Sequence, residues 1–172
     1  MELNLTADQM KRWQQLTALL NEQLIALAAD VETAGTMSPT VMTALTKVRV
    51  PQIGLTTTTD RLADQTLSLL ALAQGSASIA TMLAAWWQVA DQIMTFGTDP
   101  QQKRYLAQPH MMGLPVARAS QVPVVTAMPV TDGWQLTGEV HNRVNCGTAQ
   151  TYLVLAQNPP DVPTACLVAA DL

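Results

Sequence analysis

Charged residues are scarce in this sequence. Lys, Arg, Asp and Glu make up 13% of its 172 residues, about half the share typical of globular domains. The nine basic residues are scattered and the formal net charge is −4, so no basic stripe is available for nucleic acid or an anionic membrane surface. The composition therefore predicts a mildly acidic protein with an uncharged polar surface and no nucleic-acid partner.

Cysteines and long apolar runs are also few. Two cysteines in a chain of this length do not form a disulfide framework. The first residues, Met1–Asn4, lack the basic and apolar segments of a signal peptide. The longest apolar stretch, residues 79–89, contains Thr81 and Gln88 and is too short to span a bilayer. We therefore expect a soluble, cytoplasmic protein with no membrane partner.

Apolar residues recur with helical spacing through the first two-thirds of the chain. Thr6 and Gln9 form a capping-box pattern ahead of the first apolar stripe. Ser38 precedes a proline at a helix start, Pro51 is expected to end that helix, and Ser76 or Ser78 caps a long apolar one. These signals predict a helical bundle, with helices over residues 7–34, 39–50, 61–74, 77–96 and 101–106.

The pattern changes after residue 109, where prolines and short β-branched runs replace the helical spacing. Strand patterns occur at residues 122–126, 134–137, 152–156 and 164–169. Helices first and strands second is the order of an α+β fold. The predicted domains are a helical N-terminal domain over residues 1–110 and a partial β-domain over residues 111–172.

Several segments resemble the acyl-CoA dehydrogenase family. The junction Phe96–Leu106 resembles that family's FGT-x-x-QK-x-x-YL motif, and Gly133–Gly138 resembles its G-[YW]-x-L-x-G hairpin. Weaker resemblance covers Gly35–Pro51, Tyr152–Ala156 and Thr164–Asp171. The resemblance implies an N-terminal helical bundle followed by an incomplete antiparallel β-domain. The family's C-terminal bundle, with its catalytic glutamate, has no counterpart in this chain.

The same resemblance implies FAD as cofactor and an acyl-CoA thioester as ligand. Ser120 stands where the family has the threonine of a TEP motif, and Asn145 matches a common asparagine, so both are implied cofactor-binding residues. The glycine–serine–aspartate part of that motif is absent. Asn142 and Val144 stand where the family has an aromatic ring and a hydroxyl that contact the flavin. No catalytic residue is assigned.

The two histidines and Cys146 are candidates for catalysis or metal binding, but each is isolated in the sequence. His110 and His141 stand apart, without other ligand types at metal-site spacing, so we interpret them as surface or loop residues and predict no metal. Cys146 follows Asn145 in a turn pattern. Only Arg143 is near enough in sequence to lower its pKa, so we interpret it as an incidental thiol rather than a nucleophile.

Two further groups have structural interpretations. Trp86 and Trp87 lie on the most apolar helix, and at least one of them is expected in the core. Adjacent helical residues point about 100° apart, so one of the two is expected to face a cleft or a partner. Asp60, Asp64 and Asp91 are interpreted as helix caps or members of solvated faces.

Three functions remain open. The first is an acyl-CoA dehydrogenase-like flavoprotein, an oxidoreductase acting on the CH–CH group of acyl thioesters, incomplete or inactive as this chain alone. The second is a non-catalytic binding or assembly module derived from that fold. The third is that the chain is a truncated product of a longer gene. An absent half predicts an open sheet edge and exposed apolar helical faces, and hence self-association or a partner chain that covers them.

Overall fold

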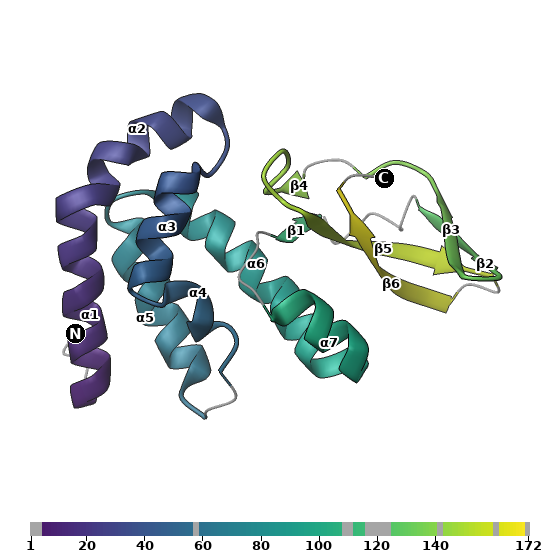
Figure 1. The fold of residues 1–172 in the computed structure, drawn as a ribbon, viewed down its shortest axis with the longest axis horizontal. Helices are drawn as coiled ribbons and strands as arrows, with labels where there is room; N and C mark the ends of the chain where they lie inside the picture. The colour runs from purple at the N-terminus through teal and green to yellow at the C-terminus, as the bar shows by residue number, and fades with distance from the viewer. Residues whose placement is uncertain are drawn as a thin grey trace. The chain divides into compact units, whose positions relative to one another are not determined.

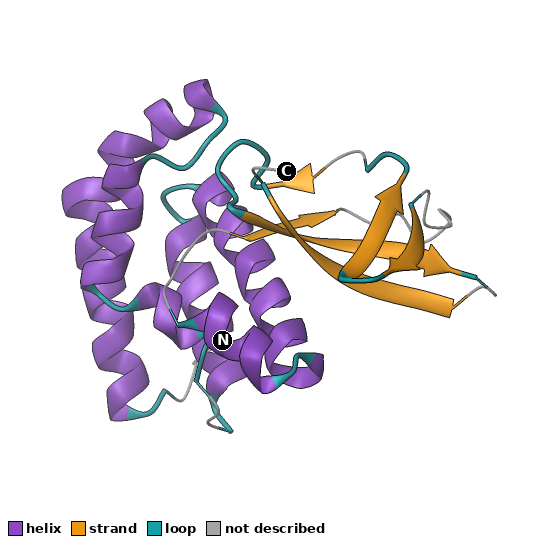
Figure 2. Ribbon diagram, turned by 45° about the vertical axis from the view of Figure 1, so that its right-hand side comes forward, coloured by secondary structure: helices purple, strands orange, loops and turns teal. Residues whose placement is uncertain are grey.

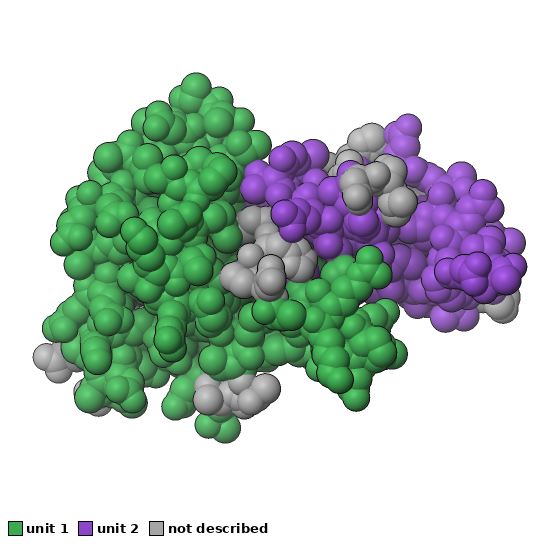
Figure 3. Space-filling view, in the orientation of Figure 1, with its two compact units in different colours: residues 1–109 green, residues 110–172 purple. Residues whose placement is uncertain are grey.

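The computed structural model describes residues 5–56, 59–107, 112–115, 125–140, 143–159 and 162–170. The chain divides into two compact units, Met1–Pro109 and His110–Leu172, coloured separately in Figure 3. All described helices lie in the first unit and all described strands in the second. This arrangement confirms the predicted α+β class.

The first unit is built from helices throughout (Figure 1). Its elements are α1 (Ala7–Leu19), the π-helical η1 (Leu20–Leu24), α2 (Ile25–Ala34), α3 (Pro39–Lys47), α4 (Val50–Ile53), α5 (Arg61–Ala73), α6 (Ala77–Phe96) and α7 (Asp99–Leu106). In the described part of the chain, no helix is both long and apolar enough to cross a bilayer.

The elements α1, η1 and α2 follow one another without a break, as the apolar stripe predicts. The N–H of Gln9 donates to the Thr6 hydroxyl (3.2 Å) and the N–H of Thr6 donates to the Gln9 side chain (3.0 Å), which completes the expected capping box. The chain leaves α2 at Gly35, in the left-handed conformation with φ of 65°. The π-helical turn was not predicted, because one inserted residue barely alters the apolar spacing.

The region around Pro51 differs from the prediction. Ser38 caps α3 as expected, accepting a hydrogen bond from the N–H of Val41 (3.3 Å). However, α3 already ends at Lys47, and Pro51 lies in the first turn of α4. A proline is well tolerated there because the first N–H groups of a helix have no partner within it. The change of direction comes from Arg49, which has a positive φ of 58°.

Ser76, rather than Ser78, caps α6. Its hydroxyl accepts a hydrogen bond from the N–H of Ile79 (3.2 Å). Asp60 occupies the N-cap position of α5 and is exposed, as one of its two predicted interpretations requires, but its side chain makes no cap hydrogen bond. An ion pair between Arg61 and Asp91 (2.8 Å) joins the start of α5 to the later part of α6, so these two packed helices run antiparallel.

Both tryptophans of α6 are buried. Trp86 is 1% exposed and Trp87 3% exposed, so the expectation that one of them faces a cleft or a partner is wrong. The indole N–H of Trp87 donates to the backbone carbonyl of Pro51 in α4 (3.3 Å). Helix α6 is therefore covered on more than one side, which a single-helix pattern cannot reveal.

The junction after α6 is held by side-chain hydrogen bonds. The N–H of Thr98 donates to the Gln101 side chain (2.8 Å), so Thr98 is the N-cap of α7. The Gln102 amide donates to the carbonyls of Met94 (3.3 Å) and Gly97 (3.0 Å). The last carbonyls of α6 thus gain partners from α7, which fixes the sharp turn between the two helices.

The second unit is a six-stranded sheet (Figure 2). Its strands are β1 (Met112–Pro115), β2 (Thr126–Val130), β3 (Gly133–Thr137), β4 (Arg143–Val144), β5 (Thr151–Asn158) and β6 (Val162–Ala169). The predicted strands at 134–137, 152–156 and 164–169 are confirmed. The strand predicted at 122–126 overlaps β2 only at Thr126, and residues 122–124 lie outside the described ranges. β1 and β4 were missed because they are short.

The strand order is β3-β2-β5-β1-β4, with β6 paired to β5. β6 is antiparallel to β5, and β2 and β3 form an antiparallel hairpin. β1 and β2, however, both run parallel to β5. The predicted purely antiparallel sheet is therefore corrected to a mixed one. Parallel pairs need crossover connections rather than hairpin turns, and such connections leave no short-range signal in the sequence.

One face of this sheet forms the core of the unit. Tyr152 lies opposite Val168, and Val154 lies opposite Cys166, in the β5–β6 register. The buried members of the cluster are Val125, Ala127, Ala149, Tyr152, Val154, Ala156 and Cys166. Residues two apart on a strand share a face, so the alternation in β5 and β6 places these side chains together.

Candidate functional site

The residue assigned from sequence to cofactor binding lies in the turn after β4. Asn145 is 5% exposed and has a positive φ of 65°, a conformation that asparagine tolerates better than most residues. Its side-chain amide donates to the carbonyl of Met112 in β1 (2.8 Å). Its own carbonyl accepts from the N–H groups of Thr148 (3.1 Å) and Ala149 (2.9 Å). Asn145 therefore ties β1 to residues 145–149, the Asn145 turn.

Tyr152 of β5 supports the same turn. Its hydroxyl accepts a hydrogen bond from the N–H of Gly147 (3.4 Å), which also has a positive φ of 83°. Its ring lies against Gly113 of β1, where a Cβ would come within 2.2 Å of the ring. Sequence reasoning missed both contacts, although a glycine within a strand is a signal for such a close approach. β1, β5 and the Asn145 turn are thus locked together.

The side chains next to this turn test whether a flavin fits. Val144 in β4 is half-buried and lies opposite Leu114 in the β1–β4 register. Its aliphatic side chain can neither stack on a ring as an aromatic residue does nor form a hydrogen bond. The amide donor of Asn145 already serves Met112. The described side chains at this turn therefore supply neither the aromatic ring nor the hydroxyl that the resemblance implies for contact with FAD. Ser120 and Asn142 lie outside the described residues.

A hollow of about 400 Å³ opens on the apolar face of the sheet. Its lining is Val125, Leu136, Gly138, Glu139, Val140, Val154 and Val168. The volume is within the range of small-molecule sites, and the lining is mostly aliphatic. These side chains can hold an apolar group, and Glu139 is the one ionisable residue among the described lining residues.

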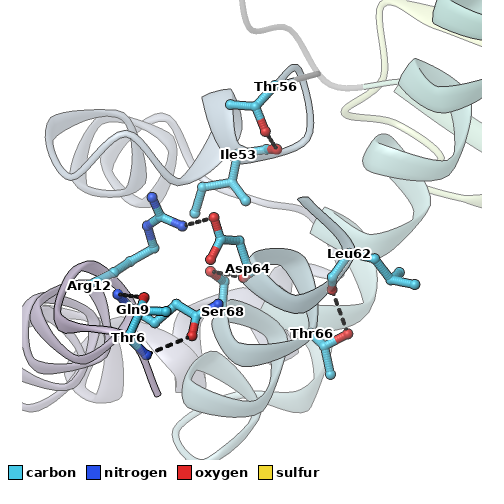
Figure 4. Close-up of polar contacts among 9 residues, drawn as sticks. All are labelled: Thr6, Gln9, Arg12, Ile53, Thr56, Leu62, Asp64, Thr66 and Ser68. Carbon is cyan, nitrogen blue, oxygen red and sulfur yellow. Dashed lines mark hydrogen bonds and ion pairs between the residues drawn. The ribbon is translucent and has the colours of Figure 1, made fainter. Parts of the chain in front are cut away.

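Two carboxylates of the helical unit, Asp64 and Asp91, form ion pairs. Figure 4 shows Asp64 of α5 in contact with Arg12 of α1. The Asp64 side chain is only 14% exposed, so the predicted solvated position is wrong, because the guanidinium from α1 both covers and neutralises it. Asp91 forms the ion pair with Arg61 noted above. Both groups have structural partners and neither points to a catalytic role.

The two thiols differ in their surroundings. Cys146 is exposed in the Asn145 turn, whereas Cys166 is buried in the sheet core. Burial raises the pKa of the Cys166 thiol above its ordinary value, so this group stays protonated and unreactive near neutral pH. No three His, Cys, Asp or Glu side chains gather at metal-binding distance within the described ranges. His110 and His141 lie outside those ranges.

No protein-family model and no curated protein matches this sequence, but solved structures match its fold. The butyryl-CoA dehydrogenase from Megasphaera elsdenii aligns with 19% identity and a TM-score of 0.82, over 99% of this chain and 50% of that one. The acyl-CoA dehydrogenase from Geobacillus kaustophilus aligns with 13% identity and a TM-score of 0.84, over 99% and 50%. A glutaryl-CoA dehydrogenase from Mycobacterium smegmatis in complex with FADH2 aligns with 15% identity and a TM-score of 0.83, over 97% and 46%.

These matches show that the chain has an acyl-CoA dehydrogenase-like fold. The resemblance inferred from the junction Phe96–Leu106 and the hairpin Gly133–Gly138 is thereby confirmed at the level of fold. The chain spans about half the length of the solved chains that it matches. Because a fold can host many functions, substrate and cofactor do not follow from the match itself.

Proposed function

We propose that this chain forms part of an acyl-CoA dehydrogenase-type flavoprotein whose catalytic base is not among these 172 residues. The observation that carries the proposal is the fold match over nearly the whole chain to butyryl-CoA and acyl-CoA dehydrogenases. A third match was solved in complex with FADH2. FAD and an acyl-CoA thioester are therefore the proposed cofactor and ligand of the complete assembly.

Within this proposal the chain supplies part of the scaffold of the assembly. Asn145 acts as a positioning residue, because its amide holds the Asn145 turn against β1. Ser120 is proposed to contact the cofactor directly. Asp64 and Asp91 are ion-paired within the scaffold, and the resemblance places the base in the C-terminal bundle, which has no counterpart among these residues.

A non-catalytic binding or assembly module is the second candidate. Val144 favours it, because its aliphatic side chain offers neither the ring nor the hydroxyl that the resemblance implies near this turn, and the Asn145 amide nitrogen donates to Met112. In this alternative the scaffold persists and the apolar hollow of the β unit serves for binding alone.

The proposed location is the cytoplasm. Cys146 and Cys166 are both free thiols. Unpaired cysteines are usual in a reducing compartment and less so in secreted proteins of small size.

A flavin titration separates the two candidates. Purified full-length chain is added to FAD and the quenching of flavin fluorescence is recorded, followed by butyryl-CoA and a dye as electron acceptor. The component proposal predicts weak saturable binding, with a Kd on the order of 10–100 µM, and no butyryl-CoA-dependent dye reduction. Binding that is absent at millimolar FAD supports the module, and dye reduction by the chain alone overturns the proposal that the base lies outside these residues.

Two asparagine variants serve as a matched pair in the same titration. Asn145→Ala removes the bond to Met112 and should weaken FAD binding several-fold by loosening the turn. Asn158→Ala changes the same residue type at the other end of β5 and should leave binding unchanged. Equal effects of the two substitutions would count against a positioning role for Asn145.

A further inference from the structure

Strand β6 forms a long edge of the sheet (Figures 1 and 2). It pairs along its eight residues with β5 and with no other described strand. Its sequence has no charged residue and a single proline, Pro163. The other outer strands are shorter, with five residues in β3 and two in β4. Charges and short lengths are the usual obstacles to edge-to-edge pairing, and β6 has neither.

Hydrogen bonds elsewhere in the sheet show which backbone groups of β6 point outward. The N–H of Gln157 in β5 donates to the carbonyl of Val125 (2.8 Å), on the side away from β6. Backbone groups alternate sides along a strand, so Pro163, which lies opposite Gln157, points outward. The bond from Ala170 N–H to the Gln150 carbonyl (3.0 Å) fits the same alternation. The outward-pointing set is Pro163, Ala165, Leu167 and Ala169.

We propose that β6 pairs antiparallel with β6 of a second copy of this chain, about a two-fold axis through Cys166. This register places Ala165 opposite Leu167 of the second copy, and Pro163 opposite Ala169. The outward N–H groups of Ala165, Leu167 and Ala169 each meet a carbonyl, while Pro163, which has no N–H, needs only to accept. The pairing gives about six interchain hydrogen bonds. It also places the large side chain of Leu167 opposite the small side chain of Ala165.

A second copy suits this edge because the strand is complementary to itself. The chain carries a net charge of −4, so two copies repel weakly, but no like charges face each other within the paired segment. A two-fold contact also closes at the dimer, since each copy uses its β6 edge once. A shift of the axis to Ala165 would leave Ala169 without a partner in β6, which makes the Cys166 register the better paired one.

Sedimentation velocity of the full-length chain between about 5 and 500 µM, under reducing conditions, tests the dimer. We expect a concentration-dependent dimer. Ala165→Lys puts a charge on the edge and should raise the dimer Kd more than tenfold. Ala165→Pro should do the same, because it removes an outward N–H without breaking a bond to β5. Val130→Lys alters an equally uncharged, 51% exposed position in β2 and should leave the dimer intact.

Oxidative cross-linking tests the register. In the proposed register the two Cys166 residues form a non-hydrogen-bonded pair with Cα atoms about 4.5 Å apart, within disulfide range. Because the buried thiol oxidises slowly, Cys146→Ser protein is left with copper-phenanthroline for hours and should then give a covalent dimer, whereas the Cys146→Ser, Cys166→Ser double variant should not. A monomer at all concentrations, or a dimer unaffected by either Ala165 substitution in folded protein, overturns the proposal.

Discussion

The indole ring of Trp87 in α6 lies directly against Gly54, the residue that follows α4. A Cβ on Gly54 would come within 2.0 Å of the ring Cδ1 atom. The same indole donates its N–H to the carbonyl of Pro51 (3.3 Å). A large aromatic side chain is therefore held against the backbone of the short helix α4.

This contact predicts the effect of adding one methyl group. Gly54→Ala should lower the free energy of unfolding by about 1–3 kcal/mol, because the indole must move and its bond to Pro51 is strained. Gly35→Ala is the comparison: nothing lies within 4 Å of a Cβ there, so only the left-handed backbone should matter, at about 1 kcal/mol. Urea unfolding followed by tryptophan fluorescence measures both. Equal losses would show that the Trp87 contact is not tight.

Asn145 allows its two roles to be separated. Asn145→Gly keeps the positive φ and removes the bond to Met112, so β1 should lose about 1–2 kcal/mol of protection. Asn145→Ala removes the same bond and adds backbone strain of about 1 kcal/mol. Hydrogen–deuterium exchange of residues 112–115 and 145–149 reports the change. If the alanine variant exchanges no faster than the glycine variant, the strain argument fails.

The two serines before α6 give a matched test of helix capping. Ser76→Ala removes the acceptor for the Ile79 N–H and should reduce stability by about 1 kcal/mol. Ser78→Ala, two residues further on and inside the helix, should change stability by less than about 0.5 kcal/mol. Thermal unfolding by circular dichroism distinguishes them, and a larger effect at Ser78 would contradict the assignment of the cap.

The thiols should differ in reactivity. Cys146 is exposed and Cys166 buried, so the native protein should release one equivalent of thionitrobenzoate from DTNB rapidly and the second only on unfolding. A Cys146→Ser variant should show the slow phase alone. Rapid reaction of two equivalents in native protein would mean that the sheet core opens readily.

The buried thiol also predicts a pH dependence. Burial raises the pKa of Cys166 above the ordinary value of 9.0. Above that pH the unfolded chain loses the proton that the folded chain retains, so the free energy of unfolding should fall as pH rises from about 9 toward the folded pKa. Cys166→Ala should flatten this slope. A slope unchanged by Cys166→Ala would assign the alkaline loss of stability to other groups.

Local signals predicted the helical unit well. The predicted helix caps and the predicted helix end are confirmed at Thr6 with Gln9, at Ser38 and at Gly35. Such caps and ends depend only on the few residues around them. The prediction failed where partners are distant. Pro51 was predicted to end a helix, but it lies in the first turn of α4, where its carbonyl accepts a hydrogen bond from Trp87. Asp64 was predicted to be solvated, but it contacts Arg12 of another helix.

The candidate site shows the same division. The pattern identified Asn145 as a residue of interest, but not that its amide donates to Met112, 33 positions earlier in the chain. The contact between Gly113 and Tyr152 was not predicted from the sequence, because it arises from the parallel pairing of β1 with β5. Parallel pairing joins segments without a turn between them and so leaves no local pattern to recognise.

The amino-acid sequence by itself indicated most of the helices, the strands at 134–137, 152–156 and 164–169, and the fold that they resemble. These properties depend on periodicity, caps and turns within a few residues. The tertiary structure alone decided the mixed sheet, the burial of both tryptophans, the contacts of Asn145 and the place of β6 as an outer strand. Each of these depends on which distant segment lies alongside, and therefore on the packing of the whole unit rather than on neighbouring residues.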